Sequence, residues 1–344
     1  MGERLRQLQG WVAEQAERNG LDLASETLRP VSGDASFRRY FRADGEQQSW
    51  IAVDAPPEKE DSRPFVAIAT HWHEAGVRVP RLLALDLDQG FMLLEDFGDR
   101  LMLPALDAQS VGRLYGQAFT ALEAIQSIPH DPLPAYDEVL LRREMALFDE
   151  WFVGRMLQLE LSTAEQQILE QARQVLVANA LEQAQVSVHR DYHSRNLMLL
   201  EGDELGVIDF QDAVAGPITY DLVSLLRDSY VRWPDPQVAR WVEEYRLRLA
   251  ANDQAPTSEA FLKQFDLMGM QRQLKVLGIF SRLYLRDGKA GYLQDMPRTL
   301  GYLYRAAGRY SSTTGLQRLL AERVVPAMTA HPLFQQMDLA QELI

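Results

Sequence analysis

Val188-His189-Arg190-Asp191-Tyr192-His193-Ser194-Arg195-Asn196 is the stretch that decides how this chain folds and what it can do. It is polar and lies between two short β-branched runs, residues 186–188 and 205–208, as a loop between strands does. A second carboxylate, Asp209, follows Asn196 by thirteen residues, at the end of the later run. Carboxylate and amide oxygens are the ligands that Mg²⁺ prefers, so the spacing predicts a Mg²⁺–phosphate site.

On either side of this stretch the chain has a different character. Upstream, the predicted strands are residues 26–31, 37–42, 50–54, 81–87 and 90–95, and the predicted helices are residues 4–18 and 63–74. After Gly98 the predicted helices are residues 111–125, 138–159 and 162–184, the last opened by the capping box Ser162-Thr163-Ala164-Glu165, and most of residues 220–344 is helical. The pattern predicts an α+β fold with a small β-rich lobe, residues 1–97, and a larger helical lobe, residues 98–344.

The composition excludes several classes of protein. With 49 acidic and 35 basic residues in 344, the net charge is −14, which argues against a broad nucleic-acid-binding face. The absence of cysteine excludes disulfides, thiolate metal sites and cysteine nucleophiles. The first twenty residues carry charges throughout, and nowhere do eighteen apolar residues run together. We therefore expect a soluble cytoplasmic protein that binds neither nucleic acid nor membrane, of unknown oligomeric state.

The polar stretch resembles a known catalytic loop. His189-Arg190-Asp191 with Asn196 matches H-R-D-x-x-x-x-N, and Asp209-Phe210 matches the first two positions of D-F-G. The chain thus resembles the protein-kinase-like superfamily, and more closely its aminoglycoside phosphotransferase branch. In that branch the third D-F-G position is often not glycine, as with Gln211, and a Gly-Pro…Asp-Leu stretch follows, as at residues 216–222. The resemblance implies a bilobal kinase fold, with the nucleotide-binding lobe at residues 1–97 and the catalytic, substrate-binding lobe at residues 98–344.

The resemblance also assigns roles to the residues of this loop. It implies ATP and Mg²⁺ as cofactors, with Asn196 and Asp209 holding the metal on the phosphates. Asp191, five residues before Asn196, would act as the general base toward a substrate hydroxyl. Two residues are expected to support the loop structurally: His189 and Asp221. Arg195 would either reach a phosphate of the substrates or only solvate the loop.

The nucleotide is expected in the β-rich lobe. Asp96-Phe97-Gly98 spells D-F-G literally, but it precedes the H-R-D loop, whereas the metal aspartate of this superfamily follows it. By order, the segment from Glu95 to Phe97 is instead the connection between lobes, whose backbone would bind adenine. The resemblance further places a phosphate-covering loop at four residues: Gly33, Asp34, Ala35 and Ser36.

The chain departs from the superfamily in one strand. Trp50-Ile51-Ala52-Val53-Asp54 lies where V-A-I-K would, and Asp54 takes the lysine position in this alignment. The missing cation could come from one of four residues: Arg38, Arg39, Arg42 or Lys59. The same departure raises the alternative of a nucleotide-binding regulatory pseudokinase.

Longer stretches narrow the resemblance. GDASFRRYFR, DAPPEKEDSRPF, LLEDFGD, HRDYHSRNLM, VIDFQDAVAGPITYDLVSLLRD and SRLYLRDGKAGYLQDMPR, spread over residues 32–298, resemble the bacterial N-acetylmuramate/N-acetylglucosamine kinases. This implies phosphorylation of the anomeric hydroxyl of these amino sugars, in cell-wall recycling toward UDP-N-acetylmuramic acid.

The acceptor leaves alternatives open. The carboxylate of N-acetylmuramate needs a cation, for which Arg282, Arg286 and Lys289 are candidates, and Asp212 could meet a sugar hydroxyl. An aminoglycoside O-phosphotransferase is the alternative enzyme, because a protein of charge −14 attracts polycationic drugs.

Overall fold

The computed structural model describes residues 2–31, 37–46, 48–250 and 256–344. The chain divides into two compact units, Met1–Ile128 with Arg195–Ala213 and Pro129–Ser194 with Val214–Ile344. Neither unit is continuous in sequence, and one crossing between them falls inside the predicted catalytic loop, between Ser194 and Arg195. The division into lobes at residues 1–97 and 98–344 stays a prediction.

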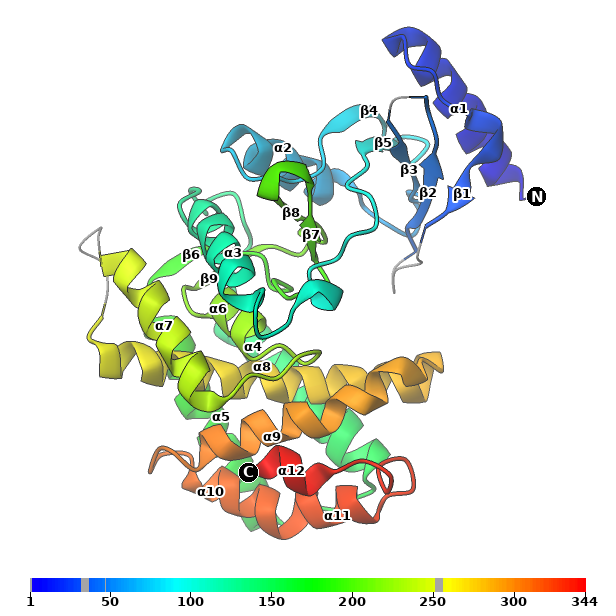
Figure 1. Cartoon of the computed structure of the whole chain (residues 1–344). Coiled ribbons are helices and arrows are strands. Elements are labelled where there is room, and N and C mark those ends of the chain that lie inside the picture. Colours follow the sequence, from blue (N-terminus) through cyan, green and yellow to red (C-terminus); the bar gives the residue numbers. More distant parts are fainter. Residues whose placement is uncertain (1, 32–36, 47, 251–255) are drawn as a thin grey trace. The chain divides into compact units, whose positions relative to one another are not determined.

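The first unit is built on a five-stranded antiparallel sheet of order β1-β2-β3-β5-β4 (Figure 1). Its strands are β1 (Arg29–Pro30), β2 (Arg39–Ala43), β3 (Trp50–Asp54), β4 (Leu82–Asp86) and β5 (Phe91–Glu95). The structure confirms the predicted strand at 50–54 and, with ends moved by one or two residues, those at 37–42, 81–87 and 90–95. The predicted strand at 26–31 is largely wrong, because Ser25–Thr27 is a 3₁₀ turn, η1, and only Arg29–Pro30 pairs.

Helix α1 (Glu3–Asn19) covers one face of this sheet (Figure 1). Its apolar stripe, Leu8, Trp11 and Val12, packs with Trp50 and Ala52 of β3 into one core. Gly20 ends the helix at φ 64°, a left-handed conformation that glycine adopts without strain. Helix α2 (Arg63–Glu74) contacts β4 and coincides with the helix predicted at residues 63–74.

A hairpin from the middle of the sequence completes the first unit. Strand β7 (Leu197–Leu199) pairs with β8 (Leu205–Val207), joined by η4 (Glu201–Asp203). The Met102 amide, just before η2 (Leu103–Ala105), donates to the Leu197 carbonyl at 2.8 Å. Helix α3 (Val111–Gln126) packs against β8 in the same unit.

The second unit surrounds one long helix. Helix α8 (Ser258–Asp287) contacts most of the helices of its unit and is buried on all sides over most of its middle (Figure 1). The elements of this unit are α4 (Glu138–Leu147), the π-helix η3 (Phe148–Met156), α5 (Thr163–Glu182), β6 (Gln185–Val188), β9 (Val214–Pro217), α6 (Tyr220–Leu226), α7 (Asp235–Ala250), α8, η5 (Ala290–Asp295), α9 (Met296–Ala307), α10 (Thr314–Leu319), the π-helix η6 (Leu320–Val324), α11 (Val325–Ala330) and α12 (Leu339–Leu343). A helix that is buried all round marks the centre of a large core.

Local signals in this unit are reproduced by the structure. The Ser162–Glu165 capping box opens α5, with the Ser162 amide donating to the Glu165 carboxylate at 2.7 Å. The predicted helix at 138–159 is divided, because α4 continues as a π-helix that ends at Met156. The predicted strands at 186–188 and 205–208 exist, but each has its own partner: β6 pairs with β9, and β8 with β7.

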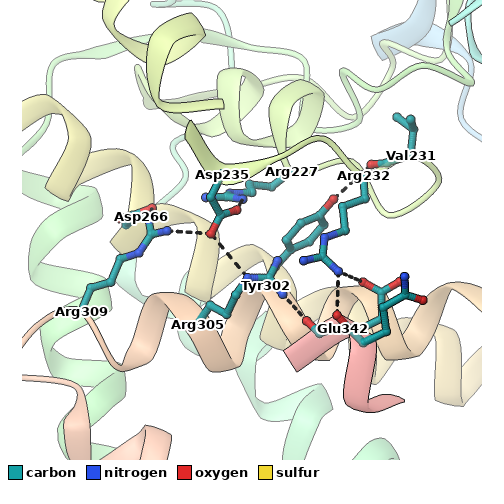
Figure 2. Close-up of polar contacts among 10 residues, drawn as sticks. Arg227, Val231, Arg232, Asp235, Asp266, Tyr302, Arg305, Arg309 and Glu342 are labelled. Carbon is teal, nitrogen blue, oxygen red and sulfur yellow. Dashed lines mark hydrogen bonds and ion pairs between the residues drawn. The ribbon is translucent and has the colours of Figure 1, made fainter. Parts of the chain in front are cut away.

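An arginine–carboxylate network joins α7, α9 and α12 in the second unit (Figure 2). The Asp235 carboxylate forms ion pairs with Arg227 at 2.5 Å, Arg309 at 2.9 Å and Arg305 at 3.5 Å. Arg232 pairs with the Glu342 side chain of α12 at 2.9 Å. Within the described part of the chain, no helix combines the length and apolar character needed to cross a bilayer.

Candidate active site

The two predicted metal ligands lie together at the open end of the β7–β8 hairpin. Asn196 directly precedes β7, Asp209 follows β8, and the Ile208 amide extends the ladder by donating to the Asn196 carbonyl at 3.1 Å. This pairing brings the Asn196 Nδ2 within 3.1 Å of Asp209 Oδ2. The side-chain amide of Gln211 donates from Nε2 to the other carboxylate oxygen of Asp209, Oδ1, at 2.7 Å.

The chemistry of this donor set fits Mg²⁺. Both groups are hard: a carboxylate offers two oxygens, and the amide of Asn196 can present its oxygen in place of its nitrogen. Asp209 also has φ 65°, a left-handed conformation that a residue other than glycine adopts at a cost of order 1–3 kcal/mol. The fold therefore holds this carboxylate in a specific, strained orientation.

Phe210 anchors Asp209 to helix α2. Its ring is fully buried and stacks on Phe65, with ring centroids 5.0 Å apart and an angle of 20° between the planes. Trp72, from the next turns of α2, contacts the same ring at 5.8 Å. This packing fixes Phe210, and with it the backbone of the neighbouring Asp209, against helix α2. It also explains why an aromatic residue follows the aspartate.

A pocket of about 340 Å³ lies within the first unit and ends at these ligands. Its apolar lining comes from the sheet and the hairpin: Val31, Ile51, Leu94, Leu101, Met198 and Ile208. The polar part of the lining includes Arg42, Arg195, Asn196 and Asp209. A pocket lined by apolar side chains together with cations and oxygen ligands suits a ligand that has an apolar ring and a phosphate chain.

The segment predicted to bind adenine lines the same pocket. The Glu95 carboxylate pairs with Arg78 at 2.6 Å, which lowers its pKa, and the Glu95 amide donates to the Arg81 carbonyl at 2.9 Å. The Phe97 ring lies under the Arg78 guanidinium at 4.7 Å and so close to β8 that a Cβ on Gly206 would stand 2.6 Å from it. Among the described residues, none accepts a hydrogen bond from the Phe97 amide.

Asp96, in the literal D-F-G, has a different use. Its carboxylate pairs with Arg42 and accepts from Ser49 Oγ at 2.6 Å and the Gly98 amide at 2.8 Å. Its side chain is 2% exposed. These contacts tie the segment that follows β5 to Arg42 of β2 and to Ser49, the residue before β3. In this structure Asp96 therefore has ion-pair and hydrogen-bond partners within the framework of the sheet.

The structure corrects the position assigned to Asp54. Residues two apart in a strand point to the same face, and Trp50 and Ala52 face the α1 core while Ile51 lines the pocket. Asp54 accordingly lies on the α1 side, fully buried, where Arg4 pairs with it at 2.6 Å and Arg39 pairs with it as well. The next pocket-side position of β3 is Val53. Asp54 is therefore a structural ion-pair partner of α1 and does not replace the lysine.

The four candidate replacements for that lysine differ in position. Arg42 lines the pocket, where Asp99 and Asp96 raise its pKa. Arg39 pairs with Asp54, Arg38 is buried with Glu60 at 3.3 Å, and Lys59 lies over the Phe37 ring at 5.3 Å. The predicted phosphate-covering residues Gly33, Asp34, Ala35 and Ser36 lie outside the described residues.

The predicted base, Asp191, lies in the second unit, in a loop whose backbone is hydrogen-bonded to a side chain of α6. Asp221, in the first turn of α6, accepts the His189 amide at 2.7 Å and the Arg190 amide at 3.0 Å. The His189 ring is buried, and its Nδ1 accepts the Asp191 amide at 3.2 Å. Arg190 has φ 75°, so this loop too is strained next to its functional residue. Burial raises the pKa of Asp221 to about 6.

Asp191 is surrounded by cations. Burial by itself would raise its pKa, but Lys275, His193, Arg272 and Arg190 outweigh burial and lower the pKa to about 2. Lys275 pairs with Glu144 at 3.2 Å and donates to the Tyr220 hydroxyl at 3.0 Å. Glu144 also pairs with Arg190 and accepts from the Tyr136 hydroxyl. Asp191 is thus an ionised carboxylate at neutral pH.

Sequence reasoning missed four residues of this environment: Glu144, Asp228, Arg272 and Lys275. Asp228 holds the loop further along, where it accepts the Ser194 amide at 3.0 Å and hydroxyl at 2.5 Å. For Arg272 and Lys275 the available signal was the run Gln271-Arg272-Gln273-Leu274-Lys275, which places polar residues between the apolar stretches 267–270 and 276–280. Buried charged residues in a core helix indicate a functional or paired role.

The three predicted substrate residues belong to different units. Arg195 lines the pocket of the first unit, and Asp212 is exposed in the same unit. Arg282 is on α8 in the second unit. Their contacts with substrate stay predictions.

Comparison with known proteins agrees with this geometry. Residues 27–262 match the model of the phosphotransferase enzyme family. The chain is 44% identical to the N-acetylmuramate/N-acetylglucosamine kinase of Pseudomonas putida over 93% of this chain and 96% of that protein. It is 47% identical to that of Pseudomonas aeruginosa, over 86% of this chain and 88% of that protein.

Solved structures share the fold at low identity. An ADP-bound aminoglycoside phosphotransferase superposes with a TM-score of 0.56 and 15% identity, over 85% of this chain and 96% of that one. A choline kinase from Streptococcus pneumoniae superposes with a TM-score of 0.60 and 11% identity, over 86% and 99%. By sequence, the chain belongs to the phosphotransferase enzyme family.

Proposed function

We propose that this protein is an ATP-dependent N-acetylmuramate/N-acetylglucosamine kinase that phosphorylates the anomeric hydroxyl of these sugars. The observation that carries the proposal is 44% identity to a kinase of that name along 93% of this chain and 96% of the relative. Residues 188–211, which hold the predicted base and both predicted metal ligands, also lie within the region that matches the phosphotransferase enzyme family. The product would feed cell-wall sugar recycling toward UDP-N-acetylmuramic acid.

ATP is implied by membership of a kinase family, and the pocket of the first unit supports its placement. The apolar lining suits adenine, and the Phe97 amide would donate to a ring nitrogen, because the Glu95 and Gly98 amides already have acceptors. Gly33, Asp34, Ala35 and Ser36 would cover the phosphates with backbone N–H groups. Arg42 or Arg195, both in the pocket lining, would meet phosphate oxygens.

Asn196 and Asp209 would hold Mg²⁺, which when bound neutralises charge on the β- and γ-phosphates. Their roles follow from their chemistry: the carboxylate supplies charge, and the amide supplies a neutral oxygen. Gln211, hydrogen-bonded to Asp209 at 2.7 Å, would fix which carboxylate oxygen faces the metal.

Asp191 would accept the proton of the attacking hydroxyl. An anomeric hydroxyl is more acidic than an ordinary alcohol, so a carboxylate with a pKa of about 2 can orient it and take its proton as the hydroxyl oxygen bonds to the γ-phosphorus. The bond from that phosphorus to the bridging oxygen of ATP breaks, and ADP leaves. His189 and Asp221 would keep this carboxylate in position through the loop backbone. Arg282 and Asp212 would contact the sugar. We place the reaction in the cytoplasm, where ATP is available.

The test is an acceptor panel with Mg-ATP, following ADP release and identifying the product by phosphorus NMR. We expect turnover with N-acetylmuramate and N-acetylglucosamine and a sugar 1-phosphate product. Turnover with kanamycin alone would refute the proposal in favour of an aminoglycoside phosphotransferase. Absence of turnover with every acceptor, together with retained ATP binding, would favour a regulatory pseudokinase, although the position of Asp54 no longer supports that alternative.

A further inference from the structure

One buried cation of the second unit, Arg272, has no hydrogen-bond or ion-pair partner among the described residues. Arg272, in the middle of α8, is 4% exposed, and among the described residues nothing accepts a hydrogen bond from its Nη1 or forms an ion pair with it. Burying a guanidinium without a compensating anion is costly, and buried charges are normally paired. An unmatched buried charge that a fold retains indicates an anionic group that is supplied from outside the chain.

The neighbouring lysine on α8, unlike Arg272, has partners within the fold. Lys275, one turn further along α8, has Glu144 at 3.2 Å and the Tyr220 hydroxyl at 3.0 Å. Its charge is therefore already compensated within the fold. Arg272 is the cation of this helix segment that remains available to an anionic ligand.

The position of Arg272 relates it to the phosphate acceptor. Arg272 lies one turn before Lys275 on α8, and Lys275 pairs with Glu144, which also pairs with Arg190, the residue before the base. The charge of Arg272 also lowers the pKa of both Asp191 and His193. The Nδ1 of His193 is likewise buried and has no hydrogen-bond partner among the described residues. Two unsatisfied polar groups thus border the carboxylate that must contact the acceptor hydroxyl.

The two proposed acceptors differ in one charged group. N-acetylmuramate carries a lactyl ether with a carboxylate, and N-acetylglucosamine has a hydroxyl at that place. A protein of net charge −14 repels an anionic sugar at long range, so the acidic acceptor requires a local cation. We propose that Arg272 binds the lactyl carboxylate of N-acetylmuramate and thereby allows the enzyme to use the acidic sugar. This inference rests on the proposed function. A guanidinium fork matches a carboxylate with two parallel hydrogen bonds.

The test compares kcat/KM for both sugars in the wild type and in Arg272→Met. We expect a loss of about 10- to 100-fold for N-acetylmuramate beyond any loss for N-acetylglucosamine, as for removal of a charged hydrogen-bond partner. Arg272→Lys keeps the charge and should recover part of the lost preference. Lys263→Met, which removes an exposed cation from the same helix, should leave the ratio of the two sugars unchanged.

A substrate-side measurement keeps the test independent of folding. The methyl ester of N-acetylmuramate lacks the charge, so the wild type should use it less well than the acid, and Arg272→Met should show no further loss with it. Equal losses for both sugars in Arg272→Met would overturn the assignment, because they would mean contact with the phosphoryl group or a structural role. No change for N-acetylmuramate would overturn it as well. If the wild type phosphorylates neither sugar, the proposed function itself fails.

Discussion

At the scale of single residues, the site depends on carboxylates whose surroundings give them different tasks. Asp191 is kept ionised by buried cations, Asp209 is held in a strained backbone conformation between two amides, and Asp221 is buried under the backbone of the loop it supports. Asp96 and Asp54 are neutralised by arginines and belong to the framework. The same residue type thus serves as base, ligand or brace according to its partners.

Replacing Asp191 by Asn removes the base while keeping the shape of the side chain. We expect kcat to fall by about 10²–10⁴-fold, since that is what a positioned base contributes. ATP binding should persist, because the pocket that we assign to the nucleotide is lined by residues of the first unit. Turnover and calorimetric ATP titration measure the two effects. A variant that keeps the wild-type rate would exclude Asp191 as the base.

Among the charged groups that lower the pKa of Asp191, Lys275 has the largest effect. Asp191 acts as a base only when it is ionised. Activity is therefore lost as the pH falls through the pKa of Asp191, because the carboxylate becomes protonated. Lys275→Met should raise that pKa and move the acid limb of kcat/KM to higher pH. Lys263→Met, an exposed position on the same helix, should leave the limb in place. An acid limb shared by wild type and Lys275→Met would show that the lysine does not act on the base.

At the scale of elements, close packing of α8 explains why a glycine occurs in its C-terminal half. A Cβ on Gly278 would stand 2.5 Å from the Cβ and the carbonyl oxygen of Leu147, at the end of α4. The two chains can approach this closely only when the position lacks a side chain. Through this contact, α4 is set against the helix that carries Arg272 and Lys275, and α4 in turn carries Glu144.

Gly278→Ala should therefore destabilise the protein by about 1–3 kcal/mol, the usual cost of overpacking a core. Gly112→Ala, in α3 with nothing within 4 Å of the new Cβ, should instead stabilise it by up to about 1 kcal/mol through helix propensity. Urea unfolding of both variants gives the comparison. Similar changes of the same sign in both would contradict the packing argument.

At the scale of the whole chain, ion pairs hold segments that are far apart in sequence. Asp235 gathers Arg227, Arg305 and Arg309, and Glu342 of α12 receives Arg232 (Figure 2). Two of the three arginines around Asp235 are nearly buried, with 8% and 11% of the side chain exposed. Both guanidinium groups pair with the same carboxylate, so Asp235 compensates their positive charges and reduces the repulsion between them.

Asp235→Asn should cost about 3–5 kcal/mol of unfolding free energy at most, since it removes the carboxylate that pairs with the two nearly buried arginines, Arg227 and Arg305. Arg309 keeps its ion pair with Asp266 at 2.9 Å. Glu150→Gln, which breaks the exposed pair with Arg155 at 2.8 Å, should cost less than about 1 kcal/mol. Thermal and urea unfolding measure both. Equal small effects would mean that the network is a surface feature with little influence on stability.

Sequence by itself determined what depends on neighbours along the chain. The Ser162–Glu165 capping box, the strand at 50–54 and the spacing of Asp191, Asn196 and Asp209 were readable because each is a local pattern. Tertiary structure decided which face of β3 Asp54 occupies, since side chains of a strand alternate between two faces and only the packing of α1 shows which face it covers. It alone also brought Arg272 and Lys275 of α8 to a carboxylate some eighty residues earlier. Such contacts arise from packing between distant segments, and no local pattern encodes them.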